Sequence, residues 1–388
     1  MKIALVHDWL TGMRGGEKCL EVACRRYPDA ELFTLLHKAG SASPAIERMR
    51  IRTSFLQRVP GIGRHYRYWL PAMPRAIESL RLPGDVDLVL SFSHAVAKGI
   101  RVPPGVPHVC YCFTPMRYAW QLREDYFGKA TQGRLAGWLP GHWPAAARDV
   151  LLELVRRWDL AASQRVTHYV AISHTVARRI AECYGRSSRV IYPPVDTRFY
   201  CPAAVPRDDY YLCVSALVPY KKIDLAVRAC RRLGRRLIVI GAGPEASRLA
   251  ALAGGDVQLL GWRSDEEVRE HMRRCRALVF PGQEDFGIVP VEAQACGTPV
   301  IAFDRGGATE TIQPAGELRR GTGFLFSQQT AECLCEAIEW FERHPDQFSP
   351  HLARGQAVSF DTERYQHELL AYLDEVAGGQ EPSRRLAA

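Results

Sequence analysis

Short apolar runs alternate with amphipathic segments along most of the chain. The runs KIALV (2–6), VDLVLSFS (86–93) and HYVAIS (168–173) predict buried strands, and segments with helical periodicity lie between and after them. A second series begins with YYLCVSAL (210–217) and continues to TPVIAF (298–303). Strands that alternate with helices at this spacing predict parallel sheets with both faces covered.

The segment between the two series divides the chain. Residues 196–209 are irregular and rich in Pro, Ala and charge, which predicts an interdomain linker. We therefore expect an α/β protein with one doubly wound domain at 1–195 and another at 210–358. Residues 359–388 should form a last amphipathic helix, FDTERYQHELLAYLDEV, and a frayed tail. A ligand of two such domains would bind in a central cleft, at the carboxyl ends of the strands.

The composition is that of an ordinary soluble protein. The 388 residues are 47% hydrophobic and 24% charged. No run approaches the ~20 apolar residues of a membrane span. The first strand meets His7 and Asp8 too early to be a signal-peptide core. We therefore expect the protein to stay in the cytoplasm.

The net charge of +9 favours anionic partners. Between Arg48 and Arg81 there are eight arginines and a single acid, Glu78, and Tyr66, Tyr68 and Trp69 lie among them. This mixture suits an anionic membrane surface. A solvated basic face with a few core aromatics is the alternative reading. Nucleic acid is not expected, because no reading motif accompanies the charge.

The cysteines and the acidic pairs do not predict a metal. The chain has twelve cysteines but no CxxC pair, whereas zinc sites want ligands two to four residues apart and then two more. We therefore expect reduced, buried thiols. Asp85 and Asp87 have the spacing of a metal clamp, but they lie directly before a buried strand and are expected in the loop that leads into it.

The segment EDFGIVPVEAQACGTPV (284–300) carries the most specific chemistry. It follows a predicted strand, and Pro290 suits the first turn of a helix. The start of such a helix attracts anions, phosphate in particular, and Gly287 lets a ligand approach the backbone. Glu284 and Glu292 bracket this anion site and would accept hydrogen bonds from hydroxyls. Two carboxylates around a diphosphate suit a nucleotide sugar.

The same segment resembles the E-x7-E motif of the retaining glycosyltransferases of family 4, which have the GT-B fold. Further segments occur in family order: VSALVPYKKIDLAV (214–227), VIGAGPE (239–245), LLGW (259–262) and GTPVIAFDRGGATETI (297–312). Four others look like bacterial mannosyltransferases that build O-antigen and capsule: GGEK (15–18), SHAVAKG (93–99), TPMRYAW (114–120) and VIYPPVD (190–196). The resemblance implies two Rossmann-like domains that face a central cleft, with the C-terminal helix crossing back to the N-terminal domain.

The resemblance also implies roles for individual residues. Glu284 would contact the sugar hydroxyls and Glu292 the ribose. Lys221 would neutralise the diphosphate, and as a cation it would stabilise the departing group. The remaining donor contacts would come from the backbone of Gly15, Gly16, Phe286, Gly287, Ile288 and Val289.

Two positions depart from the family pattern. Ala216 stands where the family usually has an arginine, so one phosphate contact is missing unless Lys222 supplies it. Phe113 stands where a histidine often lies close to the reacting sugar, and His94 is the nearest candidate to replace it. Arg117 could bind an acceptor phosphate or cap a helix.

These observations together predict a retaining glycosyltransferase that works without metal or cofactor. The expected donor is GDP-mannose and the expected acceptor is a lipid-linked saccharide at the inner face of the plasma membrane. Three alternatives remain open. One is a UDP-hexose-dependent enzyme of family 4, and another is a non-catalytic subunit that binds a nucleotide sugar or a partner. The third is an oxidoreductase, suggested by GAGPEA (241–246), although no acidic residue lies at the end of a following strand about 20 residues on.

Overall fold

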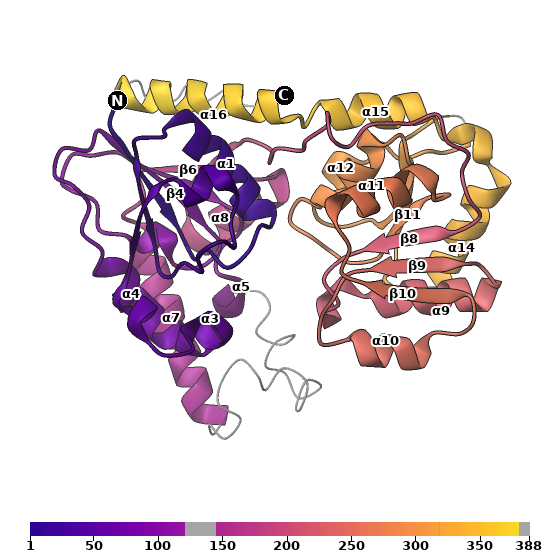
Figure 1. Cartoon of the computed structure of the whole chain (residues 1–388), viewed down its shortest axis with the longest axis horizontal. Coiled ribbons are helices and arrows are strands. Elements are labelled where there is room, and N and C mark those ends of the chain that lie inside the picture. Colours follow the sequence, from indigo (N-terminus) through magenta and orange to yellow (C-terminus); the bar gives the residue numbers. More distant parts are fainter. Residues whose placement is uncertain (121–144, 318, 380–388) are drawn as a thin grey trace. The chain divides into compact units, whose positions relative to one another are not determined.

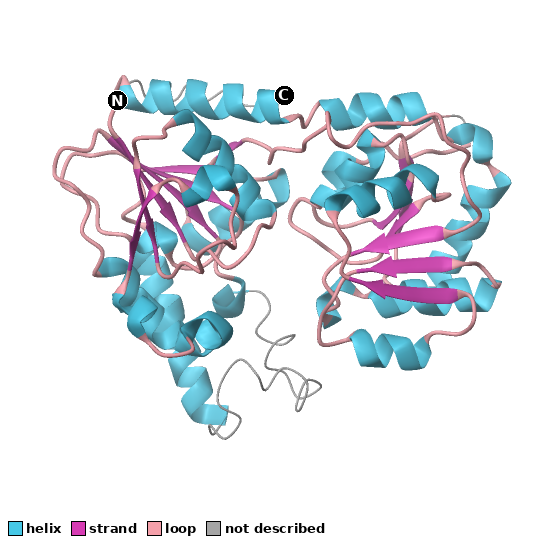
Figure 2. Ribbon diagram, in the orientation of Figure 1, coloured by secondary structure: helices cyan, strands magenta, loops and turns pink. Residues whose placement is uncertain are grey.

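The chain forms two compact α/β units (Figure 1). The computed structural model describes residues 1–120, 145–317 and 319–379. Unit 1 consists of Met1–Tyr192 together with the C-terminal segment from Tyr365, and unit 2 of Pro193–Arg364. In each unit the strands lie in the centre with helices around them (Figure 2).

Unit 1 contains a parallel sheet of seven strands in the order β3-β2-β1-β4-β5-β6-β7. The strands are β1 (Ile3–His7), β2 (Glu31–Thr34), β3 (Arg50–Thr53), β4 (Leu88–Ser93), β5 (His108–Cys112), β6 (His168–Ala171) and β7 (Arg189–Val190). All residues of β1, β4 and β5 are buried, as expected for central parallel strands covered on both faces.

The helices of unit 1 include short 3₁₀ segments, marked η. They are α1 (Gly15–Arg26), α2 (Pro44–Glu47), η1 (Phe55–Arg58), α3 (Ile62–His65), η2 (Tyr66–Ala72), α4 (Met73–Glu78), η3 (Ala97–Gly99), α5 (Arg117–Trp120), α7 (Ala145–Ser163), α8 (His174–Tyr184) and α16 (Thr362–Ala377). The Tyr365 hydroxyl in α16 donates to the Cys19 carbonyl in α1 at 3.4 Å, and Arg189 pairs with Glu375 at 2.8 Å. The expected return of the C-terminal helix to the N-terminal domain is therefore confirmed.

Unit 2 contains a parallel sheet of six strands in the order β10-β9-β8-β11-β12-β13. The strands are β8 (Tyr211–Val214), β9 (Leu237–Ile240), β10 (Val257–Gly261), β11 (Leu278–Phe280), β12 (Val300–Phe303) and β13 (Gly323–Phe326). The helices are η6 (Pro219–Lys221), α9 (Ile223–Leu233), α10 (Ala246–Leu252), α11 (Asp265–Arg274), α12 (Ile288–Ala295), α13 (Ala308–Thr311), α14 (Ala331–Arg343), η7 (Pro345–Gln347) and α15 (Pro350–Val358).

Each sheet has one topological switch point, where neighbouring strands are not consecutive and the strand order reverses. In unit 1 the switch lies between β1 and β4, and in unit 2 between β8 and β11. Because the connections leave these two strands in opposite directions, the carboxyl ends of a doubly wound sheet open at the switch point, and ligands bind there. The two switch points are therefore where site residues are expected.

The alternating pattern predicted the fold correctly, and the two parallel sheets are confirmed. The strands β2, β3 and β13 were not expected from the sequence. Strand β7 is short and ends at Val190, and Pro193 and Pro194, which follow it, cannot donate to a sheet ladder.

His108 links the stability of unit 1 to pH. Its side chain is buried at the start of β5, and its Nε2 lies 2.8 Å from the Ser91 hydroxyl of β4. Burial, together with the nearby positive charge of Arg165, lowers the pKa of His108 to about 3. The folded protein therefore holds this imidazole neutral, whereas the unfolded chain binds a proton at its ordinary pKa of about 6.5.

We predict that this histidine weakens the fold between about pH 6.5 and pH 3. The unfolded state binds one more proton in this window, so the free energy of unfolding should fall by about 1.4 kcal/mol for each pH unit of acidification. We would measure the free energy of unfolding by urea titration at pH 6 and at pH 5. His108→Gln should lower its change between these two pH values by about 1.4 kcal/mol, the effect of one proton, whereas the exposed His351→Gln should leave the change as in wild type. Equal slopes in wild type and His108→Gln would contradict the assignment.

Candidate functional site

The turn between β11 and α12 forms one edge of the switch point in unit 2. Gly287 caps α12 with φ at 82°, a left-handed conformation that favours glycine. Pro290 lies in the first helical turn, as predicted. The first four residues of a helix have no partner for their amides within it, so those of Ile288, Val289 and Val291 can bind an anion, while Pro290 has no amide hydrogen. The Phe286 side chain packs edge-on against Phe360 at 5.6 Å, so only its backbone can serve a ligand.

A second turn, after β12, presses against the first. The amide of Gly307 donates to the Glu284 carbonyl at 2.8 Å, and Glu284 and Gly306 form a β-bridge. A Cβ on Gly306 would lie 2.2 Å from the Glu284 carbonyl oxygen, and one on Gly307 would lie 2.2 Å from that of Phe286. No side chain fits at these distances. The glycine pair thus fixes the backbone from which the Glu284 carboxylate projects.

Lys221 meets this turn from the other side of the switch point. Its ammonium group forms an ion pair with the Glu284 carboxylate, and the two side chains are 14% and 23% exposed. Gly282 makes the approach possible, because a Cβ there would lie 2.9 Å from the Lys221 carbonyl oxygen. A partly exposed pair stabilises the fold little. Its significance is that a cation, a carboxylate and a helix start share one place.

Lys222, the next residue, is exposed and has a left-handed backbone, with φ at 53°. This conformation costs a non-glycine residue about 1–2 kcal/mol. It lies between η6 and α9 and lets the chain turn abruptly after Lys221. Strain of this kind is often retained where a loop must present a functional group.

Glu292 lies inside α12 and is 5% exposed. Burial, with a smaller contribution from the Glu292 charge, raises the pKa of Tyr200 above its usual range. The carboxylate is therefore close to Tyr200, at the end of the segment that opens unit 2. Arg354 holds the same segment: its Nη1 donates to the carbonyls of Thr197, Tyr200 and Ala295 at 2.7, 2.8 and 3.1 Å. Neither Tyr200 nor Arg354 was expected from the sequence.

The glycines of GAGPEA serve packing within unit 2. Gly241 has φ at 141°, and a Cβ there would lie 1.8 Å from the Ser215 carbonyl oxygen. At Gly243 a Cβ would lie 2.3 Å from the Leu217 carbonyl oxygen. The loop after β9 is thus pressed against the loop that leads to Lys221. This close packing accounts for the two glycines, so they need not be explained by dinucleotide binding.

Asp85 and Asp87 are engaged at the opposite end of the unit 1 sheet. The Lys2 side chain pairs with Asp85, and its amide donates to Asp87 at 2.6 Å. Both carboxylates lie before β4, as expected from the sequence. Among the described residues no group of three or more His, Cys, Asp or Glu side chains is arranged to hold a metal ion. All twelve cysteines are free thiols.

The switch point of unit 1 holds a second polar pair. Asp8 follows β1 directly and His94 follows β4, and the Nδ1 of His94 lies 3.0 Å from an Asp8 carboxylate oxygen. The His94 ring contacts Trp9 edge-on at 4.6 Å and remains about one third exposed. The sequence singled out His94 but not Asp8. The position of Asp8 could have identified it as a candidate, because it directly follows the first strand, and ligand groups lie at the carboxyl ends of parallel strands.

The other expected residues of unit 1 lie at the ends of their elements. Gly15 begins α1, and a Cβ on Gly16 would touch the Phe113 ring at 3.2 Å and the His7 ring at 3.6 Å. Phe113 thus fills space beside the start of α1. Arg117 begins α5 and is half-buried. In unit 2 the structure brings Lys221, Glu284 and residues 286–289 together, and in unit 1 it brings His94 near Phe113 and Phe113 near Gly16.

Both halves of the chain match glycosyltransferase family models. Residues 20–199 match the model described as Glycosyltransferase Family 4, and residues 202–353 match Glycosyl transferases group 1. The boundary between the matches falls near the start of unit 2.

Curated relatives match over about half of the chain. The GDP-mannose-dependent alpha-(1-6)-phosphatidylinositol monomannoside mannosyltransferase of Mycobacterium tuberculosis is 27% identical over 242 residues, which are 54% of this chain and 58% of that protein. The D-rhamnosyltransferase WbpZ of Pseudomonas aeruginosa is 28% identical over 224 residues, with 53% and 58% covered. In both comparisons less than two thirds of the relative is spanned.

Solved structures share the whole fold at low identity. HepE of Anabaena, determined with UDP and glucose, is 18% identical and has a TM-score of 0.67, with 96% of this chain and 99% of that chain covered. Sucrose-phosphate synthase of Thermosynechococcus elongatus is 16% identical with a TM-score of 0.71, over 98% and 100%. The expected GT-B fold is confirmed.

Proposed function

We propose that this chain, a GT-B protein whose two halves match glycosyltransferase family models, is a glycosyltransferase that uses a nucleotide sugar. The observation that carries the proposal is the unit 2 switch point. There Lys221, the start of α12 and the Glu284 carboxylate meet on a backbone fixed by glycines. The ammonium group and the helix amides suit a diphosphate, and the carboxylate suits the free hydroxyls of a sugar.

The positively charged groups would bind the diphosphate, and the carboxylates would bind hydroxyl groups. The departing nucleoside diphosphate gains negative charge as its bond to the sugar breaks, and Lys221 and the helix amides would stabilise that charge without a proton or a metal. Since Lys221 is paired with Glu284, an incoming diphosphate would compete for the ammonium group and release the carboxylate. Glu284 would then accept hydrogen bonds from the sugar hydroxyls. Glu292 would contact the ribose, which requires its buried carboxylate to become accessible.

We further propose a retaining transfer of mannose from GDP-mannose to a lipid-linked saccharide of a surface polysaccharide. A curated relative carries GDP-mannose dependence in its name, and another is a rhamnosyltransferase. In this reaction the bond from the sugar C1 to the diphosphate oxygen breaks, and a bond to the acceptor hydroxyl oxygen forms on the same face. The hydroxyl proton leaves on the departing diphosphate. A UDP-hexose is the competing donor, because HepE was determined with UDP and glucose.

A surface of unit 1 suits contact with an anionic membrane. We define the basic-aromatic surface by the exposed arginines and large apolar residues of the region from Arg48 to Arg81: Arg48, Arg50, Arg52, Phe55, Arg58, Trp69, Arg75 and Arg81. Phe55 and Trp69 are large apolar side chains that are 48% and 40% exposed. Apolar and cationic side chains together bind the headgroup region of anionic lipid.

The expectation that Tyr66 would anchor at the headgroups is wrong. Its ring is buried and lies 5.0 Å from Trp9. The 3₁₀ segment η2, with Pro71 inside it, turns Tyr66 and Leu70 into the core and leaves Trp69 outside. The helices in the described part of the chain include no candidate for a membrane span.

We predict that GDP-mannose protects the fold from thermal unfolding and that UDP-glucose and UDP-galactose do not. A ligand at 100 times its Kd stabilises the native state by about 2.7 kcal/mol. Lys221→Ala should reduce the shift in melting temperature by about half or more at the same ligand concentration, whereas the exposed Lys38→Ala should retain it. If only the UDP-hexoses protect the fold, the donor is a UDP-hexose and not GDP-mannose. Protection without any slow hydrolysis of the bound nucleotide sugar would favour the non-catalytic subunit.

We predict that the protein sediments with vesicles containing phosphatidylglycerol and that salt releases it. Each arginine near such a surface contributes about 1 kcal/mol, and the attraction fades within a Debye length. Arg58→Glu with Arg75→Glu should reduce binding at least about tenfold, and Phe55→Ser with Trp69→Ser should also weaken it. Arg228→Glu with Arg232→Glu, exposed in α9 of unit 2, is the matched control. Equal sedimentation of all variants would show that the basic-aromatic surface is only solvated.

A further inference from the structure

One carboxylate accepts four backbone hydrogen bonds and meets an imidazole at the switch point of unit 1. One Asp8 oxygen accepts from the amides of His94 and Ala95 at 2.7 and 3.0 Å, and His94 Nδ1 lies 3.0 Å from the same oxygen. The other accepts from the amides of Val96 and Ala97, both at 2.7 Å. The loop after β4 is thus wrapped around a single side chain that comes from β1.

The Asp8 carboxylate is charged although its side chain is fully buried. Burial alone would raise its pKa, but His94, His7 and the backbone donor hold that pKa well below the usual range. A buried carboxylate is tolerated when hydrogen bonds replace its water, and here the amides of the loop do so. Four donors from the backbone already satisfy the two oxygens. The carboxylate therefore does not need the His94 ring as a further partner in order to be stable in the folded protein.

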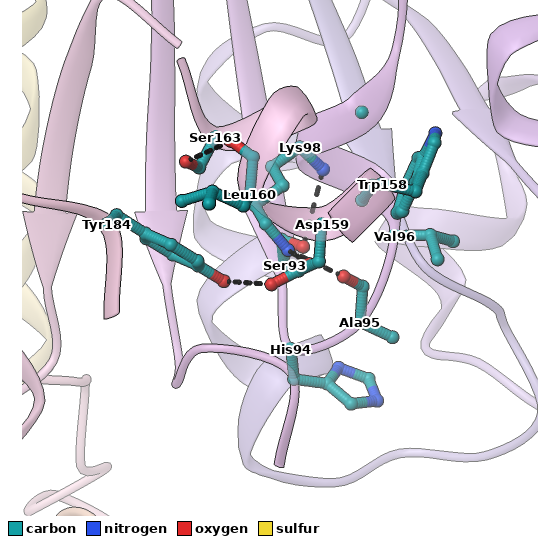
Figure 3. Close-up of polar contacts among 12 residues, drawn as sticks. Ser93, His94, Ala95, Val96, Lys98, Trp158, Asp159, Leu160, Ser163 and Tyr184 are labelled. Carbon is teal, nitrogen blue, oxygen red and sulfur yellow. Dashed lines mark hydrogen bonds and ion pairs between the residues drawn. The ribbon is translucent and has the colours of Figure 1, made fainter. Parts of the chain in front are cut away.

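A second buried charge holds the far end of the same loop. Lys98 pairs with Asp159 of α7 and donates to the Ala95 carbonyl at 2.8 Å (Figure 3). Asp159 also accepts from the Tyr184 hydroxyl at 2.7 Å and from Trp120 Nε1 at 2.8 Å. Residues 94–98 are therefore fixed from two sides, and within the described part of the chain His94 Nε2 has no hydrogen-bond partner.

We propose that Asp8 is a positioning residue that acts through His94. With the proton held on Nδ1 toward Asp8, the lone pair of Nε2 faces away from the loop and accepts a hydrogen bond from a substrate hydroxyl. The pair thus gives unit 1 a preorganised acceptor for a sugar, and no proton need be transferred. This inference rests on the proposed function, because the hydroxyl belongs to the donor sugar or to the saccharide acceptor.

The tautomer of His94 tests the geometry without any activity. In ¹H–¹⁵N spectra of the imidazoles, with His94 assigned by comparison with His94→Ala, the neutral ring should carry its proton on Nδ1. Asp8→Asn should shift or broaden this signal. Asp87→Asn is the matched control, because Asp87 also accepts a backbone amide but lies at the other end of β4. A wild-type ring with its proton on Nε2 overturns the proposal, even if Asp8→Asn does not fold.

A double-mutant cycle separates positioning from a purely structural role. His94→Ala and Asp8→Asn should each lower kcat of donor hydrolysis or transfer by tenfold or more. In the His94→Ala background, Asp8→Asn should add less than threefold. An equal loss in both backgrounds shows that Asp8 only supports the fold and overturns the proposal. If no nucleotide sugar is turned over, the proposed function fails, and the tautomer alone then decides whether Asp8 orients His94.

Discussion

The reversal of strand order between β8 and β11 is the constraint on which the candidate site depends. Connections that diverge from two neighbouring parallel strands leave their carboxyl ends uncovered, so groups placed there can reach a ligand. In unit 2 the loops around this point are packed so closely that Gly282, Gly306 and Gly307 have no room for a side chain. The close packing fixes Lys221 and Glu284 before any ligand arrives. Groups held in this way lose little entropy on binding.

Unit 1 repeats the arrangement with different chemistry. At its own switch point the buried Asp8 carboxylate organises a loop, and His94 is the side chain that this loop exposes in part. Unit 2 thus offers a cation and helix amides, which suit a diphosphate. Unit 1 offers an imidazole, which suits a hydroxyl. Unit 2 also carries the Glu284 carboxylate, so each unit has a hydrogen-bond acceptor for hydroxyls, whereas the cation and the helix amides described here belong to unit 2.

The local patterns predicted what depends on neighbours in sequence. Buried runs and turn residues identified the two sheets, and the spacing of Glu284, Gly287 and Pro290 identified the turn at α12. Strand β3 was missed because it alternates exposed arginines with half-buried residues, which gives no apolar run. Tyr66 was grouped with surface residues because the mixture of arginines and aromatics says nothing of which ring faces the core, and the structure buries Tyr66 in η2. Contacts between distant positions, such as Asp8 with residues 94–97, had no signal in spacing at all.

The proposed function assigns the diphosphate to Lys221 and the sugar to Glu284. Isothermal titration of wild type, Lys221→Ala and Glu284→Ala with GDP and with GDP-mannose distinguishes these two roles. Lys221→Ala should weaken both ligands about tenfold or more, since a hydrogen bond to a charged group contributes about 1.5–3 kcal/mol. Glu284→Ala should leave the affinity for GDP unchanged or higher, because the ion pair no longer competes, and should remove the preference for GDP-mannose over GDP. A loss of GDP binding in Glu284→Ala as large as that in Lys221→Ala would contradict this division of roles.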